Sequence, residues 1–249
     1  MHQGALDERC PNVLSHRRGT SIDRHQITTS TLTGLVEEQL KRDLDHNCEP
    51  LGKQGARGAL FKVTLASHRY TFVGKGTVQA FVPDLLHEAQ IYRRLTDIQG
   101  YVVPVHLGSI DMSRINKVYY LDFKVRIVHF LLMSWAGEAA AYDATAITSK
   151  DFKEEIRLSE NEMCQRGVIH GDVRGPNILW NRELGRVMLV DFERSTMLDQ
   201  GPPKRKSEAL VDMSPNKRRR MTSGGAEKIF TQKTLHVKTL LDGKEPTLR

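Results

Sequence analysis

Apolar residues recur along the chain with two different periods, which alternate between helix-like and strand-like segments. Apolar positions three and four residues apart predict a helix that begins at Thr29 or Ser30 and runs to about Leu44. Two strand-like runs, 59–65 and 70–75, flank a short polar turn and predict a hairpin. The other predicted elements are a helix opening at Pro83, strands at 102–107, 118–123 and 127–133, a helix at 149–166, and a hairpin of 178–180 with 186–190. This mixture predicts an α+β protein.

The two ends of the chain lack this periodicity. Residues 1–28 are polar, and residues 201–249 begin with a Gly-Pro-Pro break and continue with basic and Ser/Gly-rich sequence. Segments with so few apolar residues cannot bury enough surface to offset the entropy of ordering them. We therefore expect both ends to be disordered and the folded body to span residues 29–200.

Charge and composition narrow the class of protein. The net charge of +7 lies in residues 201–249, which hold 12 Lys/Arg and 5 Asp/Glu, so the body itself is balanced. A balanced body disfavours specific nucleic-acid binding. No window approaches the roughly 18 to 20 apolar residues of a membrane span, and no secretory signal is predicted. Three scattered cysteines predict a reduced, intracellular protein.

One stretch of the body carries a specific chemical pattern. His170 is followed by Asp172 and Asn177 with the spacing H-x-D-x-x-x-x-N, and an apolar strand then ends at Asp191. Phosphoryl transfer needs a carboxylate that orients the attacking hydroxyl, and an Asn and a second carboxylate that hold Mg²⁺. Both oxygen donors suit that ion. The pattern therefore favours an ATP- and Mg²⁺-dependent phosphotransferase.

These residues resemble the protein-kinase superfamily, and most closely its atypical and fungal-type kinase-like members. The resemblance implies a two-lobed fold, with an antiparallel-sheet small lobe and hinge over 29–137 and a helical but incomplete large lobe over 138–200. It implies that Asp172 is the catalytic base, that Arg174 stabilises the transferring phosphate, and that Asn177 and Asp191 bind the metal. His170 would support the loop structurally.

In the small lobe the same resemblance implies a nucleotide-binding set. Lys75 ends an apolar strand and would hold the phosphates, while Glu88 on the next helix would be its ion-pair partner. Gly55 and Gly58 precede a strand and would belong to a phosphate-covering loop. Each feature has a plainer explanation, since a lysine at a strand end is often a solvated charge and spaced glycines often form a linker.

Several departures from the family pattern leave alternatives open. Gly171 replaces the arginine that binds an activating phosphate, and Glu193 replaces a glycine after the metal-binding aspartate. Glu193 would either add a carboxylate near the metal or lock the segment. Few residues remain after Glu193 to complete a large lobe. The rival functions are therefore a pseudokinase that binds nucleotide or a nuclear protein, and a small-molecule kinase; the hydroxyl acceptor stays unknown.

The C-terminal tail carries two basic clusters separated by ten residues. They are Lys204, Arg205 and Lys206, followed by Lys217, Arg218, Arg219 and Arg220. This spacing resembles a bipartite nuclear-localisation signal, which implies an import receptor as partner and a nuclear location. The plainer explanation is a solvated tail that attracts polyanions without specificity.

Overall fold

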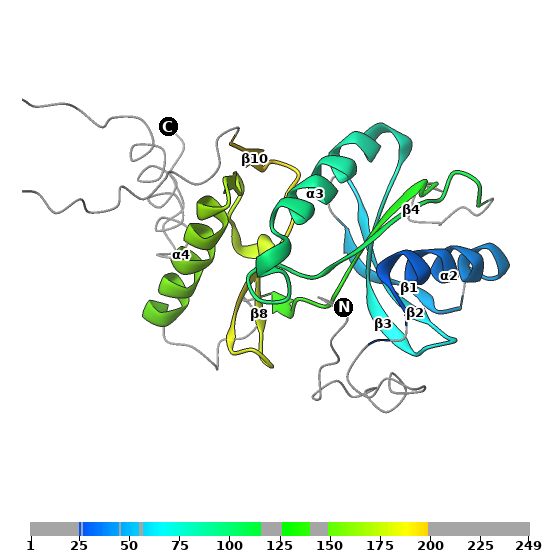
Figure 1. Ribbon diagram of the computed structural model, residues 1–249, viewed down its shortest axis with the longest axis horizontal. Helices are drawn as coiled ribbons and strands as arrows, with labels where there is room; N and C mark the ends of the chain where they lie inside the picture. The colour runs from blue at the N-terminus through cyan, green and yellow to red at the C-terminus, as the bar shows by residue number, and fades with distance from the viewer. Residues whose placement is uncertain are drawn as a thin grey trace, which may run out of the picture.

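The structure is a computed structural model, which describes residues 25, 27–44, 46–54, 57–115, 126–139 and 149–198. The strand predicted at 118–123, the basic tail and nearly all of residues 1–28 lie outside these described residues. The described part is an α+β protein with three α-helices and a five-stranded antiparallel sheet (Figure 1).

The main sheet has the strand order β1-β2-β3-β5-β4 (Figure 1). Its strands are β1 Cys48–Gln54, β2 Ala59–Leu65, β3 Tyr70–Thr77, β4 His106–Asp111 and β5 His129–Met133. The predicted first hairpin is confirmed, because β2 and β3 pair in continuous register. Lys75 lies in the central strand, opposite Leu60 on one side and Leu131 on the other.

Helix α2, Thr29–Arg42, covers one face of the sheet and confirms the first predicted helix (Figure 1). Its cap is Thr28, whose hydroxyl accepts a hydrogen bond from the backbone N–H of Thr31 at 3.1 Å. Its buried apolar face joins the alternate buried residues of β2 in one hydrophobic cluster. This burial, rather than helix propensity, holds α2 in place.

Helix α3, Val82–Arg94, lies between the sheet and the C-terminal elements (Figure 1). It follows the short 3₁₀-helix η2, Gln79–Phe81, and carries Pro83 in its first turn, as predicted from the sequence. Its buried face is apolar except for Glu88. A second hydrophobic cluster packs this face against both the sheet and the C-terminal part.

The C-terminal part combines one helix with short strands. Its elements are α4 Ser149–Gln165, β6 Glu138–Ala139, β7 Val168–Ile169, the 3₁₀-helix η5 Gly175–Asn177, β8 Ile178–Asn181, β9 Arg186–Leu189 and β10 Thr196–Met197. The predicted second hairpin and the helix at 149–166 are thus confirmed. Strands β6, β8 and β9 form one small sheet, and β7 and β10 another. The backbone N–H of Leu189 donates to the Val102 carbonyl at 2.9 Å and links this part to the region after α3.

Two strand predictions differ from the structure. The strand expected at 102–107 begins only at His106, because Val102 is fully buried between the two parts and bonds Leu189 instead of a ladder partner. Strand β1 was not predicted from its glycine- and proline-containing sequence. It pairs with β2 through an irregular register between Pro50 and Gln54, where Gly52 has a φ of +66°.

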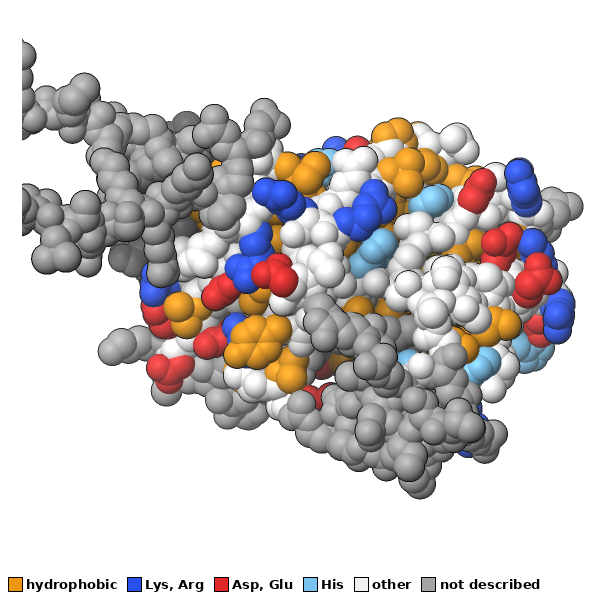
Figure 2. All heavy atoms as spheres, viewed as in Figure 1, with side chains coloured by type: hydrophobic (Ala, Val, Ile, Leu, Met, Phe, Trp, Pro, Cys, Tyr) orange, Lys and Arg blue, Asp and Glu red, His pale blue; other side chains and the backbone are white. Residues whose placement is uncertain are grey.

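The surface of the described part carries mixed charge. On the face in Figure 2, acidic and basic side chains are interspersed over the body. This distribution agrees with the balanced charge of the first 200 residues. No helix among the described residues is long and apolar enough to cross a bilayer.

Candidate functional site

Three residues predicted from the sequence as site residues meet around one ammonium group. Lys75 Nζ on β3 lies 2.7 Å from Glu88 Oε2 on α3 and 2.7 Å from Asp191 Oδ1, just after β9. Lys75 and Asp191 are 116 positions apart in sequence. The structure therefore brings together the expected phosphate-binding lysine, its ion-pair partner and an expected metal ligand.

Burial strengthens the electrostatic coupling at this point. The Glu88 side chain is almost inaccessible to water, and burial raises the pKa of its carboxyl although Lys75 opposes that shift. Burial also acts to lower the pKa of Lys75, but the attraction of Glu88, Asp191 and Glu193 outweighs it and raises that pKa. Lys75 is therefore a permanent cation held by three carboxylates.

Asp191 is positioned by an unusual backbone conformation and by its neighbour. Its φ is +69°, a left-handed conformation that aspartate tolerates better than most residues. The next residue, Phe192, is fully buried and packs edge-on against the rings of Tyr92 and His170, each with a centroid separation of 5.0 Å. This packing anchors the segment and turns the Asp191 carboxylate toward Lys75.

His170 contacts the backbone on both sides of the loop around Asp172. Its Nε2 lies 3.0 Å from the Val190 carbonyl, and its Nδ1 lies 3.3 Å from the Asp172 backbone nitrogen. Burial lowers the pKa of the ring, so it is neutral near pH 7. A neutral imidazole can donate from Nε2 to Val190 and accept at Nδ1, which fixes its tautomer.

Asn177 and Arg174 both contact Asp172. The Asn177 amide nitrogen donates to the Asp172 carbonyl at 2.9 Å and approaches Asp172 Oδ2 at 3.4 Å. Arg174 Nε lies 3.2 Å from the same carboxylate oxygen. With its nitrogen engaged, Asn177 keeps its side-chain oxygen as the atom suited to a cation.

The structure explains why position 171 is a glycine, which the sequence alone did not reveal. Its φ is +81°, and a Cβ at this position would come within 2.2 Å of the Arg194 carbonyl oxygen. The loop therefore passes too close to the segment after Asp191 for any side chain. The arginine that the family pattern places here does not fit this backbone.

The glycine loop is described only in part. Gly55 lies outside the described residues, whereas Gly58 packs directly against the site. A Cβ on Gly58 would lie 2.8 Å from the Gly76 carbonyl oxygen and 3.8 Å from Lys75 Cγ. Gly58 thus permits close approach of the segment before β2 to the strand that carries Lys75.

Two further charged residues join the site. Glu193 Oε1 lies 3.2 Å from Lys75 Nζ, and Glu193 Oε2 lies 3.7 Å from Arg57 Nη1. Arg57 also pairs with Asp84 at 3.1 Å. The sequence analysis predicted that Glu193 would either add a carboxylate near the metal or lock the segment, and it gave no signal for Arg57. Arg57 lies between Gly55 and Gly58 of the expected glycine loop, and only the folded structure shows that its charge faces Glu193 and Asp84.

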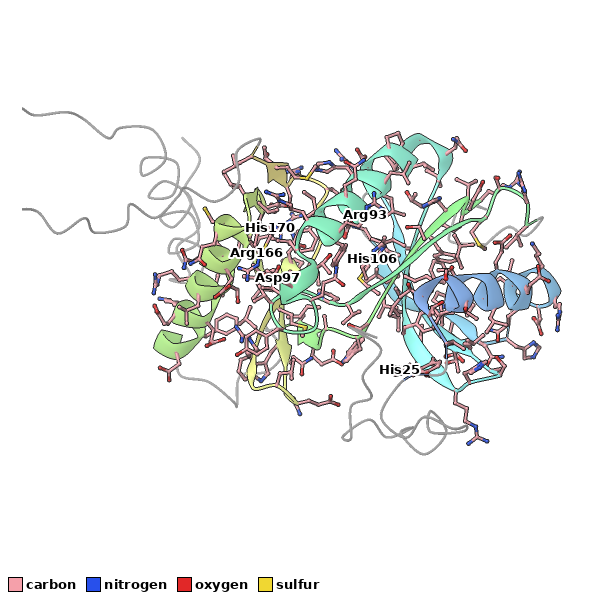
Figure 3. All side chains as sticks on the ribbon, in the orientation of Figure 1. His25, Arg93, Asp97, His106, Arg166 and His170 are labelled. Carbon is pink, nitrogen blue, oxygen red and sulfur yellow. The ribbon has the colours of Figure 1, made fainter. Side chains whose placement is uncertain are left out.

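An ion-pair contact holds the layers around the site. Arg166, just after α4, lies 2.7 Å from Asp97 in the 3₁₀-helix η3, Thr96–Ile98, which follows α3 (Figure 3). Arg94 also donates to the Arg166 carbonyl at 2.8 Å. These contacts fix the C-terminal end of α3 against α4, and α3 in turn carries Glu88.

The donor set at the site suits a divalent cation. Carboxylate oxygens of Glu88, Asp191 and Glu193 lie within 4.8 Å of one another. Glu88 Oε1 is buried and has no hydrogen-bond partner in the part of the chain that the structure describes. Oxygen-only donors of this kind match Mg²⁺. Lys75 already lies among these carboxylates, so its ammonium supplies the positive charge that the cluster holds in this structure.

No family model matches this chain, and a curated protein is similar to it over most of the chain's length. The chain is 40% identical over 229 residues to the "Meiotic driver SPOK2" of Podospora anserina. The alignment covers 90% of this chain but 28% of the relative, so the chain spans under a third of that protein.

This comparison corrects the family expected from the sequence. The short motifs around Asp172 and Asp191 resembled the protein-kinase superfamily, yet no family model matches, and the named relative is a meiotic driver. The assignment to that superfamily and its fungal-type members is therefore wrong. Two short motifs, even at workable spacing, did not carry enough information to assign a family. The chemistry of the site has to be argued from its own geometry.

Proposed function

We propose that this chain is an ATP- and Mg²⁺-dependent phosphotransferase that acts on a hydroxyl acceptor. Its sheet-rich part and its C-terminal part would serve as the two lobes of a kinase-like arrangement around the site. The observation that carries the proposal is the contact of Lys75 Nζ with both Glu88 and Asp191 at 2.7 Å. Those contacts join the central strand, the buried face of α3 and the segment after β9 at one cation.

Lys75 would bind the phosphates of the nucleotide. Its ammonium carries three N–H donors on a strand that is held rigidly by pairing on both sides. Glu88 would keep that ammonium in place, since its carboxylate is buried and fixed on α3. A positioned cation of this kind stabilises negative charge that develops on a transferring phosphoryl group.

Asp191 and the side-chain oxygen of Asn177 are the residues that would hold Mg²⁺. When bound, Mg·ATP would supply an activated γ-phosphoryl group, which passes to the acceptor oxygen while ADP leaves. Asp191 is accessible enough to bind a metal ion from solution, because about a third of its side chain is exposed to solvent. Glu88 Oε1, which has no hydrogen-bond partner among the described residues, adds a further acceptor within the same cluster.

Asp172 would orient the acceptor hydroxyl and take its proton. The carboxylate is steadied by Asn177 and Arg174 on one side and by the His170-supported backbone on the other. Arg174 is more than half exposed, so it is free to turn from Asp172 toward a phosphate. Acceptors of either protein or small-molecule type are compatible with these roles.

A binding module without transfer activity is the second candidate. It is favoured by the observation that both reactive groups already have partners: Lys75 contacts three carboxylates, and Asp172 contacts Arg174. Such a module would bind nucleotide or a nuclear protein through the same site. It differs from the enzyme in one measurable respect, because it produces no phosphorylated acceptor or ADP.

Transfer is tested by following ADP formation and ³²P incorporation from Mg·[γ-³²P]ATP with the purified chain. Asp172→Asn should reduce turnover by about 10² to 10⁴-fold while leaving ATP affinity close to that of the wild type. Arg157→Gln, on the exposed side of α4, is the matched control and should leave turnover unchanged. No turnover by a folded wild type that still binds ATP would favour the binding module.

The basic tail is proposed to direct the chain to the nucleus. Its two clusters carry the spacing that an import receptor recognises, and they lie outside the described residues. The proposal rests on sequence spacing alone and is independent of the phosphotransferase site.

A further inference from the structure

We propose that Glu193 occupies the position of a nucleotide phosphate between two cations, and that Arg57 is a second phosphate-binding side chain. This inference rests on the proposed function, since it names residues of the same site. It starts from the arrangement of charges around Lys75 and concerns two residues that no motif assigned.

Three carboxylates surround the Lys75 ammonium, which donates hydrogen bonds to Glu88 and Asp191 and forms an ion pair with Glu193. Glu88 and Asp191 each lie 2.7 Å from Nζ, and Glu193 lies 3.2 Å away. An ammonium has three N–H groups, and two of them donate to Glu88 and Asp191. A phosphate that contacts the third must take the place beside Nζ that Glu193 holds. Glu88 is almost wholly buried and fixed on α3, and Asp191 is the expected metal ligand. Glu193, with the longest contact, is the partner that can leave.

The second carboxylate oxygen of Glu193 points to the residue that would share the phosphate. Oε2 lies 3.7 Å from Arg57 Nη1, so the carboxylate bridges Arg57 and Lys75. A phosphate is also an anion with several oxygens that can bridge two cations. Arg57 is partly exposed, with 37% of its side chain in solvent, and can therefore meet an entering ligand.

Contacts around Arg57 hold it beside Glu193, where a second cation could bind a phosphate that also contacts Lys75. Its carbonyl accepts a hydrogen bond from the Thr77 hydroxyl at 2.5 Å, and its guanidinium lies over the Phe81 ring and beside Asp84. Next to it, Gly58 approaches the strand that carries Lys75. The loop, the end of β3 and the start of α3 therefore fix Arg57 on the same side of the site as Glu193.

The charge balance explains the consequence for binding. Lys75 and Arg57 face four carboxylates, those of Glu88, Asp191, Glu193 and Asp84. An incoming triphosphate must displace the Glu193 carboxylate from the two cations. The displaced carboxylate then repels the bound phosphate, because both are negatively charged. Removing the Glu193 charge should therefore strengthen nucleotide binding, whereas removing the Arg57 charge should weaken it.

The test is isothermal titration of the full chain with ATP and with inorganic tripolyphosphate, each without and with Mg²⁺. Glu193→Gln should lower the Kd for both ligands about tenfold in the absence of Mg²⁺, and Arg57→Gln should raise it about tenfold. In the double variant the increase in affinity caused by Glu193→Gln should be smaller, because Arg57, one of the two cations that Glu193 bridges, has been removed. Glu154→Gln and Arg157→Gln, an exposed pair on α4, are matched charge controls.

Each outcome decides the inference separately from the proposed function. If Glu193→Gln weakens binding only when Mg²⁺ is present, Glu193 is a metal ligand and the inference is wrong. Wild-type ATP binding that neither variant changes relative to the controls also overturns it, while the proposed function stands. Tighter tripolyphosphate binding by Glu193→Gln in a chain that transfers no phosphate supports the inference although the proposed function fails. Absence of any anion binding by folded wild type and Glu193→Gln contradicts both.

Discussion

Lys75 Nζ and Asp191 Oδ1 lie 2.7 Å apart although 116 positions separate them in sequence. This contact joins the central strand of the main sheet to the segment that follows β9. Phe192, packed against Tyr92 and His170, fixes that segment from behind. The site is thus built from both parts of the described chain and depends on their packing.

The Lys75–Glu88 pair should make Lys75 important for stability as well as for binding. Lys75→Met leaves the buried Glu88 carboxylate next to Asp191 and Glu193 without its cation, which we expect to cost about 3 to 5 kcal/mol in the free energy of unfolding. Urea denaturation measures this loss. The double variant Lys75→Met/Glu88→Gln should recover much of it, because the unpaired charge is removed.

The pH dependence of Lys75→Met provides a second check. Without Lys75 the pKa of Glu88 should rise further above its unfolded value, so the folded state binds the proton more tightly. The stability deficit relative to wild type should therefore narrow as pH falls through that pKa and widen as pH rises. A deficit that is independent of pH, or is equally large in the double variant, would contradict this electrostatic explanation.

Gly171 should tolerate no side chain. Gly171→Ala forces a Cβ to within 2.2 Å of the Arg194 carbonyl at a φ of +81°, so the Asp172 loop or the segment after Asp191 must shift. We expect a loss of about 2 kcal/mol or more by chemical denaturation. Gly175→Ala is the matched control, because no atom of the described residues lies within 4 Å of its Cβ position. Equal stability of the two variants would show that the close approach does not exist in solution.

His106 should make the fold less stable in acid. Burial, with a contribution from Arg93, lowers the pKa of His106 from 6.5 to about 4 (Figure 3). The unfolded chain therefore binds more protons between these values, and the free energy of unfolding should fall as pH drops from about 6.5 to 4. Because the ring is partly solvated, we expect about 2 kcal/mol from this residue.

The variant His106→Phe isolates that contribution. Phenylalanine keeps a ring to stack on Tyr92 and removes the buried Nε2, which has no hydrogen-bond partner among the described residues. Stability against pH should be flatter in this variant than in wild type. Buried His170 and half-buried His129, whose pKa values are also lowered, will keep part of the slope. An unchanged slope would show that His106 does not titrate as this environment requires.

The basic tail should act as an import signal independently of the site. A fluorescent fusion of the chain is expected in the nucleus, and replacing Lys217, Arg218, Arg219 and Arg220 by alanine should distribute it throughout the cell. Asp172→Asn serves as the control and should leave the distribution unchanged. Nuclear accumulation that survives the loss of both basic clusters would refute the tail's role.

Local sequence patterns predicted much of the fold. The β2–β3 hairpin, α3 with Pro83 in its first turn, and the β8–β9 hairpin follow from apolar periodicity and turn residues that lie close together in sequence. The start of β4 was mispredicted because Val102 and Val103 are buried in the cluster between the two parts of the molecule instead of in a strand of the main sheet. Apolar pattern alone does not distinguish these two kinds of burial.

The site was predictable to the extent that its motifs were local. His170, Asp172, Asn177 and Asp191 stand close together in sequence, and Lys75 with Glu88 could be paired from strand and helix order. The roles of Arg57 and Glu193 could not be predicted, since each depends on side chains from segments far apart in sequence. The family inferred from the same motifs was wrong, because similar residues at a site do not establish a shared family.

The central claim is a Mg²⁺-dependent nucleotide site, which calorimetric titration with ATP tests most directly. Wild type should bind ATP more tightly with Mg²⁺ than without it, and Asp191→Asn should lose that Mg²⁺-dependent gain. Asparagine is the substitution of choice because it tolerates the positive φ of Asp191, so an unchanged melting temperature should accompany the loss. A folded wild type that binds no ATP, or an Asp191→Asn variant with the full Mg²⁺ effect, would contradict the account.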